Sequence, residues 1–374
     1  IQAFELAEKR GQKTALATVV HVEGSSYRAP GARMLIRDDG ALTGAISGGC
    51  LEGDALRKAL MAIMQDQPLL VTYNTTDEEN AVIGINLGCN GVIRVLIEPI
   101  NSKNSLNPIA LLKIVVQEKS PTVLITLFSV ENHRDNRQGT RLLIKNDQVI
   151  AQNMPAMITD DYGKSPAGYV NKMCYDVKKV FELQRSLFIN YKITASKQNT
   201  ETTTIPDDMT AFIEYLMPEI SLVIAGAGND VLPLVQMAEW MGWRTTLIDG
   251  RPGYANSQRF AGCQIIVAAP ENALLDKVMN NRSACLLMSH NYNYDKAMLR
   301  RLSEYYVPYI GMLGPKKKRD RMLSELKEDG IAFSSEQLSC IYSPIGLDIG
   351  AETPEEIACA IIAEINMSFS RCTG

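Results

Sequence analysis

Hydrophobic and polar positions follow two different patterns on either side of residue 219. From there onward, short apolar runs alternate with amphipathic stretches. The apolar runs predict strands, and stretches such as 231–242 and 294–306 predict helices. The predicted strands cover residues 221–226, 244–249, 263–269, 283–290 and 307–313. Such alternation is typical of a doubly wound parallel sheet covered by helices on both faces, so we expect a Rossmann-like domain.

The start of the last helix of this domain is predicted from three residues. Thr353 suits the N-cap, Pro354 suits the first helical position, and Glu356 completes a capping box. We therefore expect a helix that begins at Pro354 and continues through the apolar stretch that follows it.

Before residue 219 the pattern repeats itself. Residues 14–40 align with residues 122–148 without a gap, and most apolar positions stay apolar. Identical pairs include Thr14/Thr122, Leu16/Leu124, Thr18/Thr126, Val22/Val130, Glu23/Glu131, Gly31/Gly139, Arg33/Arg141, Ile36/Ile144 and Asp39/Asp147. Weaker similarity pairs 70–74 with 187–191 and 93–100 with 210–217. We expect two tandem modules, each with a strand, a hairpin, a helix and two closing strands.

Together these patterns predict an α/β protein with an α+β front part and a Rossmann-like back part. We expect three domains: a first module over residues 1–100, a degenerate second copy over 101–218, and the Rossmann-like domain over 219–374. The chain opens within a helical pattern that has no cap, so we expect further residues upstream.

Composition narrows the class of protein. A net charge of −4 and a pI near 5.6 argue against nucleic acid as an electrostatic partner. No apolar run is long enough to span a membrane, and no signal peptide opens the chain. The chain has 8 cysteines but no Cys-X-X-Cys pair, which fits a reducing cytoplasm better than a disulfide scaffold.

The first candidate site is the stretch "ISGGCLEGDALRKAL", residues 46–60. Gly48 and Gly49 allow an unusual backbone and a close approach by a ligand. Cys50 follows them in the predicted first turn of a helix, where free N–H groups favour a thiolate that binds soft metals or sulfur. The second module keeps no equivalent of "SGGC", which favours a functional Cys50 over one that only fills space.

Two further loops of the first module carry candidate residues. "EGSSYRAPGAR", residues 23–33, offers N–H groups and hydroxyls at Gly24, Ser25 and Ser26, and its Arg28 and Arg33 suit an anionic ligand. The second module keeps an arginine in the place of Arg33, which also allows a structural role. Cys89 lies in the glycine-rich "GINLGCNG"; with Cys50 it gives too few ligands for a closed zinc site but suits a softer metal or a persulfide.

The Rossmann-like part carries a partial dinucleotide-binding loop, "VIAGAGNDV". Gly226 and Gly228 fit its first two glycines, and Val231 replaces the third. Asp249 ends the next strand, where an acid that binds ribose is expected, although the nearby Arg251 leaves NAD and NADP both open. A nucleotide-type fold whose loop binds no nucleotide remains an alternative.

Two more features lie at the carboxyl ends of the predicted strands. His290 ends the fourth strand, where it suits a general acid/base, a metal ligand or the cap of the next helix. The stretch "GPKKKRDRM", residues 314–322, gathers positive charge at a helix start; a solvated helix end is favoured there over a phosphate site.

These residues together resemble the xanthine dehydrogenase accessory family of the XdhC/CoxI type, which are molybdenum cofactor chaperones. The matching stretches are "ATVVHVEGSSYRAPGARMLI", "GAISGGCLEG", "LGCNGVIRVLIEP", "LVIAGAGND", "IDGRPGYANSQRF", "YIGMLGPKKK" and "SPIGLDIGAETPEEIACAIIAEI". They span nearly the whole chain and are weakest across 101–205.

The resemblance implies a protein that binds molybdopterin-type cofactor, assists replacement of an oxo by a sulfido ligand, and inserts the cofactor into a xanthine dehydrogenase-type apoenzyme. It also implies a cytoplasmic homodimer and a cysteine desulfurase as a further partner. By that likeness Cys50 and Cys89 handle the molybdenum or its sulfur, and His290 is a candidate for chemistry. The residues assigned to cofactor binding are Gly24, Ser25, Ser26, Arg33, Gly48, Gly49, Glu52, Gly226, Gly228, Asn229 and Asp249.

Two other functions stay open at this point. An NAD(P)-dependent oxidoreductase would use Gly226, Gly228 and Asp249, with His290 as acid/base. A nucleotide-sensing or scaffolding module would perform no chemistry, and its function would not depend on Cys50. The sequence thus favours a cofactor-maturation chaperone over a stand-alone enzyme.

Overall fold

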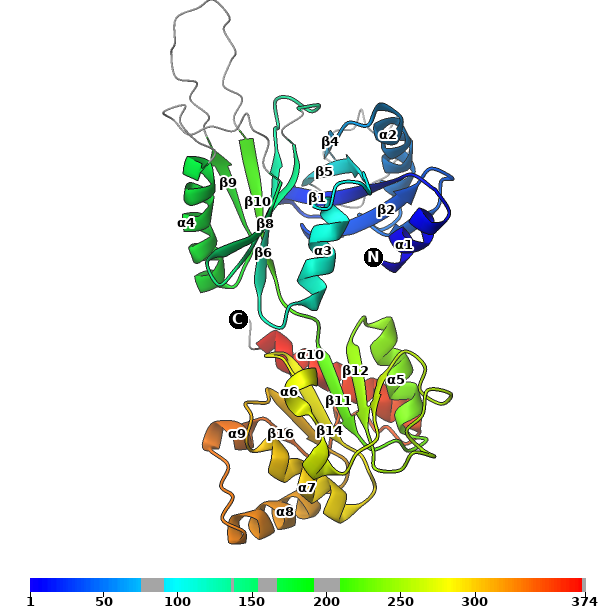
Figure 1. Ribbon diagram of the computed structural model, residues 1–374, viewed down its shortest axis with the longest axis vertical. Coiled ribbons are helices and arrows are strands. Elements are labelled where there is room, and N and C mark those ends of the chain that lie inside the picture. The colour runs from blue at the N-terminus through cyan, green and yellow to red at the C-terminus, as the bar shows by residue number, and fades with distance from the viewer. Residues whose placement is uncertain (75–90, 136–137, 154–166, 192–208, 372–374) are drawn as a thin grey trace, which may run out of the picture. The chain divides into compact units, whose positions relative to one another are not determined.

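The computed structural model describes residues 1–374 except 75–90, 136–137, 154–166, 192–208 and 372–374. It divides into two compact units, Ile1–Met217 and Pro218–Gly374 (Figure 1). Both predicted modules therefore lie in the first unit and the Rossmann-like part forms the second. The module boundary at residue 100 remains a prediction.

The first unit contains two sheets of five strands with the same order, β3-β2-β1-β5-β4 and β8-β7-β6-β10-β9. Every strand pairing in them is antiparallel. The elements of the first sheet's half are α1 (Gln2–Lys9), β1 (Thr14–Gly24), β2 (Arg33–Arg37), β3 (Leu42–Gly44), α2 (Glu52–Gln65), β4 (Leu69–Asn74) and β5 (Gly91–Pro99). Those of the second are α3 (Pro108–Gln117), β6 (Thr122–Phe128), β7 (Gly139–Lys145), β8 (Gln148–Gln152), α4 (Ala167–Leu183), β9 (Leu187–Tyr191) and β10 (Met209–Leu216).

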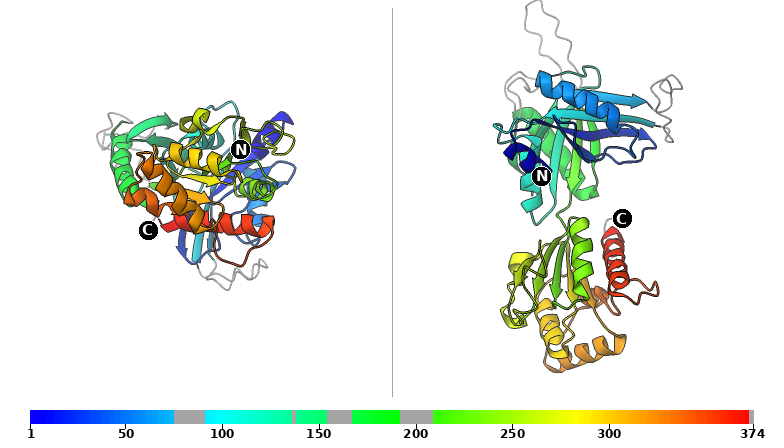
Figure 2. Two further views of the ribbon diagram at one scale, coloured as in Figure 1. Left: turned by 90° about the horizontal axis from the view of Figure 1, so that it is seen from below. Right: turned by 90° about the vertical axis from the view of Figure 1, so that its right-hand side faces the viewer.

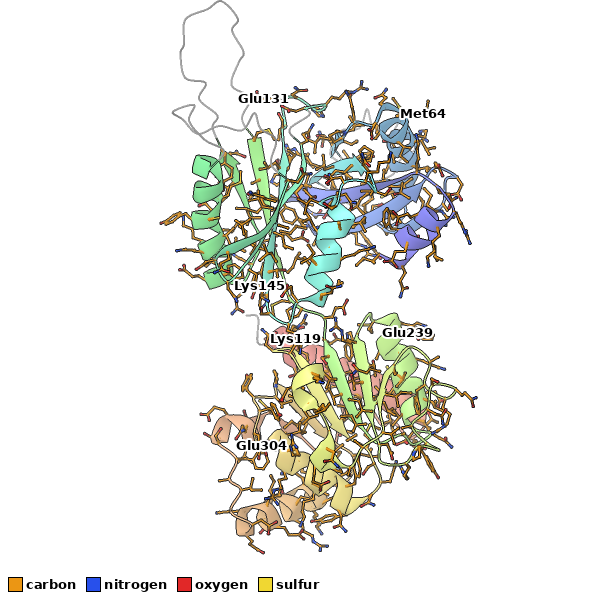
Figure 3. The ribbon with its side chains drawn as sticks, viewed as in Figure 1. Met64, Lys119, Glu131, Lys145, Glu239 and Glu304 are labelled. Atoms are coloured by element: carbon orange, nitrogen blue, oxygen red, sulfur yellow. The ribbon has the colours of Figure 1, made fainter. Side chains whose placement is uncertain are left out.

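Each sheet has one long helix on its outer face. Apolar side chains of α2 pack on the first sheet and those of α4 pack on the second. The opposite side of α2 carries Met64, which is exposed to solvent (Figure 3). The predicted α+β arrangement of two related modules is confirmed.

The closing strands of the two sheets correspond in a register that differs from the sequence alignment. Leu16 of β1 lies opposite Glu98, and the equivalent Leu124 of β6 lies opposite Glu214. Glu98 and Glu214 are therefore equivalent, whereas the alignment of 93–100 with 210–217 pairs Glu98 with Tyr215. That alignment is wrong by one residue. Strands that are apolar on both faces lack the alternation that fixes register.

The inner faces of the two sheets meet in a small apolar cluster of Val20, Leu70, Leu96, Phe128 and Phe212. Buried glutamates add polar links on both sides of it. The carboxylate of Glu98 accepts hydrogen bonds from the amide N–H (2.8 Å) and hydroxyl (2.9 Å) of Thr140. The equivalent Glu214 pairs with Arg33. Each sheet thus reaches across to the other through the same position.

The second unit is a parallel sheet of six strands in the order β13-β12-β11-β14-β15-β16. This is the strand order of a doubly wound dinucleotide-binding fold, so the Rossmann-like prediction is confirmed. Its strands are β11 (Ser221–Ala225), β12 (Arg244–Ile248), β13 (Gln264–Ile266), β14 (Ser283–Leu287), β15 (Tyr309–Met312) and β16 (Ile341–Tyr342). Its helices are α5 (Val231–Trp240), η2 (Pro270–Asn272), α6 (Leu275–Val278), α7 (Tyr292–Leu302), α8 (Lys316–Glu328), α9 (Ser335–Ser339) and α10 (Pro354–Arg371).

Helices cover both faces of this sheet. One apolar cluster packs α5 and α10 on one face, and another packs α6, α7 and α8 on the other (Figure 2). The predicted capping box starts α10: the Glu356 carboxylate accepts from the Thr353 N–H (3.0 Å), and the Thr353 hydroxyl accepts from the Glu356 N–H (3.3 Å). Among the helices that the structure describes, none is long and apolar enough to cross a membrane.

Candidate functional site

Cys50 lies exposed in the turn between β3 and α2. The helix begins at Glu52 with Leu51 as its N-cap residue, so the prediction that Cys50 occupies the first helical turn is wrong by two positions. The preceding strand, β3, ends at Gly44. The chain between strand and helix instead forms a separate loop, in which Gly49 adopts a φ of 112°.

Ser47 holds this loop together. Its hydroxyl oxygen accepts hydrogen bonds from the N–H groups of Gly49 (3.2 Å) and Leu51 (3.1 Å), and the thiol of Cys50 lies 3.5 Å from it. The same hydroxyl donates to the carboxylate of Glu52 at 2.5 Å. Ser47 was not among the predicted site residues, although a serine just ahead of a helix is a recognisable capping signal.

Glu52 closes the loop from the other side. One of its oxygens accepts from the backbone N–H groups of Ile46 (3.2 Å) and Ser47 (2.8 Å). Burial alone would raise the pKa of Glu52, but the hydrogen bonds from Ser47 outweigh it and hold that pKa below its usual value. Its carboxylate therefore shapes the loop around Cys50; its predicted contact with a cofactor remains a prediction.

Two loops of the first module and the start of β5 meet at one end of the first sheet. A Cβ built on Gly48 would lie 3.2 Å from the ring of Tyr27, so the loop of Cys50 packs against the 23–33 loop. Gly24 pairs with Gly91 at the start of β5. A Cβ on Gly91 would lie 2.6 Å from the carbonyl oxygen of Ser25, so only glycine fits there. Cys89 precedes this position but lies outside the described residues.

The two arginines of the 23–33 loop differ in whether their side chains are already paired within the protein. Arg33 donates to both carboxylate oxygens of Glu214, at 3.0 and 2.5 Å, and to the carbonyl of Gly31 at 2.9 Å. Its guanidinium therefore joins the two sheets, and its assignment to a phosphate remains a prediction. Arg28 is exposed in the same loop, and the Ser26 hydroxyl donates to its carbonyl at 2.5 Å.

The acid of the dinucleotide-type loop in the second unit is already paired. Asp249 is only 2% exposed and accepts from the Ala227 N–H at 2.9 Å and from the Arg251 guanidinium at 2.9 and 2.7 Å. Burial opposes its ionisation, but the hydrogen bonds from Arg251 keep the pKa of Asp249 below its usual value. Asn229 likewise accepts from Arg259 at 2.7 Å. The carboxylate of Asp249 is thus engaged within the protein, and its contact with a ribose remains a prediction, as does the cofactor contact of Asn229.

The glycines of the same loop serve close contacts within the protein. A Cβ on Gly226 would collide with the carbonyl oxygen of Met288, and one on Gly228 would collide with a carboxylate oxygen of Asp230. Asp230 in turn pairs with His290 at 2.8 Å. This carboxylate, which no sequence motif singled out, lies where a dinucleotide would bring its pyrophosphate. Like charges repel there, so the geometry gives NAD binding no support.

Metal binding by protein groups alone is also unsupported in the part of the chain that the structure describes. No group of three or more His, Cys, Asp or Glu side chains is arranged to hold a metal ion there. The exposed thiol of Cys50 could therefore contribute one soft ligand to a metal that arrives with its own ligands.

Comparisons with known proteins place both units in one family. Residues 7–74 match the model of the XdhC and CoxI family, and residues 222–365 match that of the XdhC Rossmann domain. A probable xanthine dehydrogenase subunit of Bacillus subtilis (strain 168) is 29% identical over 96% of this chain and 94% of its own length. The molybdenum cofactor insertion chaperone PaoD of Escherichia coli (strain K12) is 21% identical over 95% of this chain and 83% of its own length.

A solved structure extends the likeness to the fold. The crystal structure of a xanthine dehydrogenase from Bacillus halodurans superposes with a TM-score of 0.71 at 28% identity, and the match covers 99% of this chain and 95% of that one.

Proposed function

The chain belongs to the XdhC and CoxI family, and we propose that it binds the molybdenum cofactor and delivers it to a xanthine dehydrogenase-type apoenzyme. The observation that carries this proposal is that two loops, the loop of Cys50 and the 23–33 loop, meet the start of β5 at Gly91 at one end of the first sheet. The names of two relatives support it: one is a molybdenum cofactor insertion chaperone and the other a probable xanthine dehydrogenase subunit.

In this proposal the cofactor is cargo, and each loop handles one part of it. The exposed thiol of Cys50 offers sulfur to the molybdenum. The Ser25–Ser26 backbone and Arg28 receive the phosphate. Ser47 and Glu52 are positioning residues, because their hydrogen bonds fix the backbone on both sides of Cys50.

We further propose that sulfuration, the replacement of an oxo by a sulfido ligand, takes place while the chain holds the cofactor. A cysteine desulfurase supplies the sulfur as a persulfide, a thiol reductant supplies the two electrons that bring it to the sulfide level, and the displaced oxo ligand leaves as water. This chain keeps the cofactor bound and shielded until it is transferred. We also propose that the protein works in the cytoplasm as a homodimer, which light scattering coupled to gel filtration measures directly.

The experiment that tests delivery is activation of an apoenzyme. A xanthine dehydrogenase-type apoenzyme is incubated with molybdenum cofactor, with and without the chain, and the appearance of xanthine oxidation is followed. We expect the wild-type chain to accelerate activation and Cys50→Ser to lose that acceleration. Cys359→Ser removes a thiol that is also exposed, on α10, and should behave as wild type. Equal activation with and without the chain would refute the proposal.

A further inference from the structure

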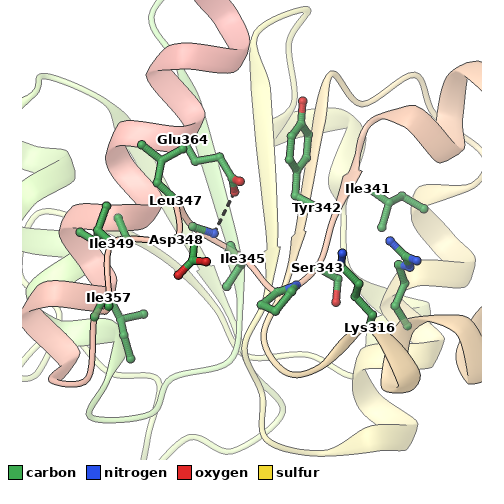
Figure 4. A pocket seen from close by; sticks show the side chains of 16 residues that line it. Lys316, Ile341, Tyr342, Ser343, Ile345, Leu347, Asp348, Ile349, Ile357 and Glu364 are labelled. Atoms are coloured by element: carbon green, nitrogen blue, oxygen red, sulfur yellow. Dashed lines mark hydrogen bonds between the residues drawn. The ribbon is translucent and has the colours of Figure 1, made fainter.

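A large cavity in the second unit is not explained by the functions considered so far. It measures about 680 Å³ and opens at the carboxyl ends of β15 and β16, between the segment 341–351, the start of α8 and the side of α10 (Figure 4). This volume lies within the range of small-molecule sites. In doubly wound sheets the carboxyl ends of the strands are where ligands bind.

One wall of the cavity holds a buried carboxylate. Glu364 is 8% exposed, and its Oε2 accepts from the N–H of Gly346 (2.8 Å) and from the hydroxyl of Tyr309 (2.5 Å). Both hydrogen bonds that Glu364 makes within the described chain use Oε2, so Oε1 is left for a ligand. An acceptor fixed in this way selects a ligand that presents N–H donors.

The opposite wall carries positive charge. Lys316 and Arg319, in the first turn of α8, both line the cavity, and Lys316 lies across from Asp348 and Glu364. The guanidinium of Arg319 also donates to the carboxylate of Asp320, at 2.9 and 2.7 Å, so Lys316 is the cation of this pair without an internal acid. Lys316 is exposed, whereas the nearby Lys318 is held by the buried Asp295 at 2.8 Å. The cations and the first N–H groups of α8 together favour an anion such as a phosphate.

Apolar side chains also line the cavity. Ile345 lies between Asp348 and Lys316, whereas Leu347 and Ile357 lie on the side of Glu364 and Asp348, and such surfaces suit a flat ring. The arrangement thus offers a carboxylate at one side, apolar contact in the middle and cations at the other side.

We propose that this cavity binds a phosphorylated 2-amino-4-oxopyrimidine ring, the ring system that guanine nucleotides and phosphorylated pterins share. The adjacent ring N–H and amino group of such a ring donate toward Glu364, and the phosphate meets Lys316 and Arg319. Adenine lacks this pair of donors. The pterin form of the ligand rests on the proposed function, and the guanine form does not.

The test is equilibrium dialysis of the full chain with GMP, AMP, guanosine and neopterin monophosphate. We expect GMP or neopterin monophosphate to bind at least about tenfold more tightly than AMP, because AMP leaves the buried carboxylate without its donors. Whichever of the two binds more tightly identifies the natural source. Saturable binding of neither below millimolar concentration, or AMP binding as tightly as GMP, would overturn the proposal.

Two pairs of variants locate the binding. Glu364→Gln keeps an acceptor for Gly346 and Tyr309 but places an amino group at the free position, so affinity should fall about tenfold or more. Glu355→Gln, an exposed acid of the same helix, should change nothing. Lys316→Ala should weaken GMP but not guanosine, and Lys317→Ala is its matched control because Lys317 does not line the cavity. Unchanged affinity in both Glu364→Gln and Lys316→Ala contradicts the assignment.

The binding test of the cavity and the activation test of the proposed function can fail independently of each other. Loss of apoenzyme activation in Cys50→Ser together with an empty cavity would remove this inference and leave delivery standing. Specific GMP binding by a chain that never activates the apoenzyme would do the reverse.

Discussion

At the scale of single residues, the loop around Cys50 depends on one buried hydroxyl. Ser47 is 4% exposed and contacts four groups through its Oγ: two backbone N–H groups, the thiol of Cys50 and the carboxylate of Glu52. The thiol is therefore presented by a loop with a defined shape. This makes Ser47 the most informative site at which to disturb Cys50 without replacing it.

We expect Ser47→Ala to lower the free energy of unfolding by about 1 to 3 kcal/mol, because the N–H groups of Gly49 and Leu51 and one carboxylate oxygen of Glu52 lose this partner. Urea unfolding measures this loss. Ser303→Ala removes an exposed hydroxyl that bonds only the Arg300 carbonyl and should cost far less. Equal stability of the Ser47→Ala variant and the wild type would show that the loop does not depend on this hydroxyl.

We expect His21 to contribute to the pH dependence of the free energy of unfolding. Burial and the charge of Arg94 lower the pKa of His21 below its usual value of 6.5, against the smaller opposing effect of Glu23. The unfolded chain therefore binds this proton more readily than the native protein, and stability is lost as the pH falls below 6.5 toward the lowered pKa. We expect the free energy of unfolding to fall more steeply between pH 7 and 5, roughly the range in which histidine titrates, in wild type than in His21→Gln. Parallel curves would contradict this assignment.

At the scale of elements, the second module keeps the positions that join the two sheets but not the glycine and cysteine loop of the first. Glu98 and Glu214 occupy equivalent places in β5 and β10, and each reaches across to the other sheet, one to Thr140 and one to Arg33. The glycine and cysteine loop before α2, by contrast, has no counterpart in the sequence of the second module. The duplicated sheets thus form a scaffold that carries one set of loops.

The pair of Arg33 and Glu214 tests how the two sheets hold together. Arg33→Met leaves the carboxylate of Glu214, whose side chain is 7% exposed, without its partner, and should cost about 3 kcal/mol or more in urea unfolding. Replacing both residues, as Arg33→Met with Glu214→Leu, should recover much of that loss. Arg57→Ala, in a surface pair with Asp54 where the arginine is 67% exposed, should cost less than about 1 kcal/mol. A double variant no more stable than Arg33→Met alone would contradict this account.

Elements that depend on local signals were predictable from the sequence. Strands β11 to β15 of the second unit follow from apolar runs, and the start of α10 follows from Thr353 and Glu356, whereas the two-residue strand β16 was not predicted. Properties that depend on contacts between distant segments were not. The register of β10 was missed by one residue, and the pairing of Asp230 with His290, which lies 60 residues further along the chain, was not predicted, because both are set by tertiary packing and not by periodicity.

The candidate site, too, was predictable from the sequence only in part. Cys50, its two glycines and the serine loop were found from residue types and spacing, and the structure brings their loops together. The structural duties of Glu52 and Arg33 could not be read from the sequence, because a carboxylate or guanidinium suits a ligand and an internal partner equally well.

At the scale of the whole molecule, the two units offer two different kinds of site. The first presents an exposed thiol among loops of one module, and the second combines a dinucleotide-type fold, whose usual loop is filled by its own side chains, with a separate cavity beside α10. In the proposed function, the protein holds the molybdenum cofactor through its own side chains and needs no bound nucleotide. The central claim to test is therefore that the thiol of Cys50, in the first unit, takes part in binding the cofactor.

The most direct measurement is retention of the cofactor by the full chain. The protein is incubated with molybdenum cofactor and passed over a gel-filtration column, and molybdenum and pterin are quantified in the protein peak. We predict that both co-elute with the wild type and with Cys359→Ser, and that Cys50→Ser loses them. Retention by Cys50→Ser equal to that of the wild type, or no retention by the wild type, would contradict the account.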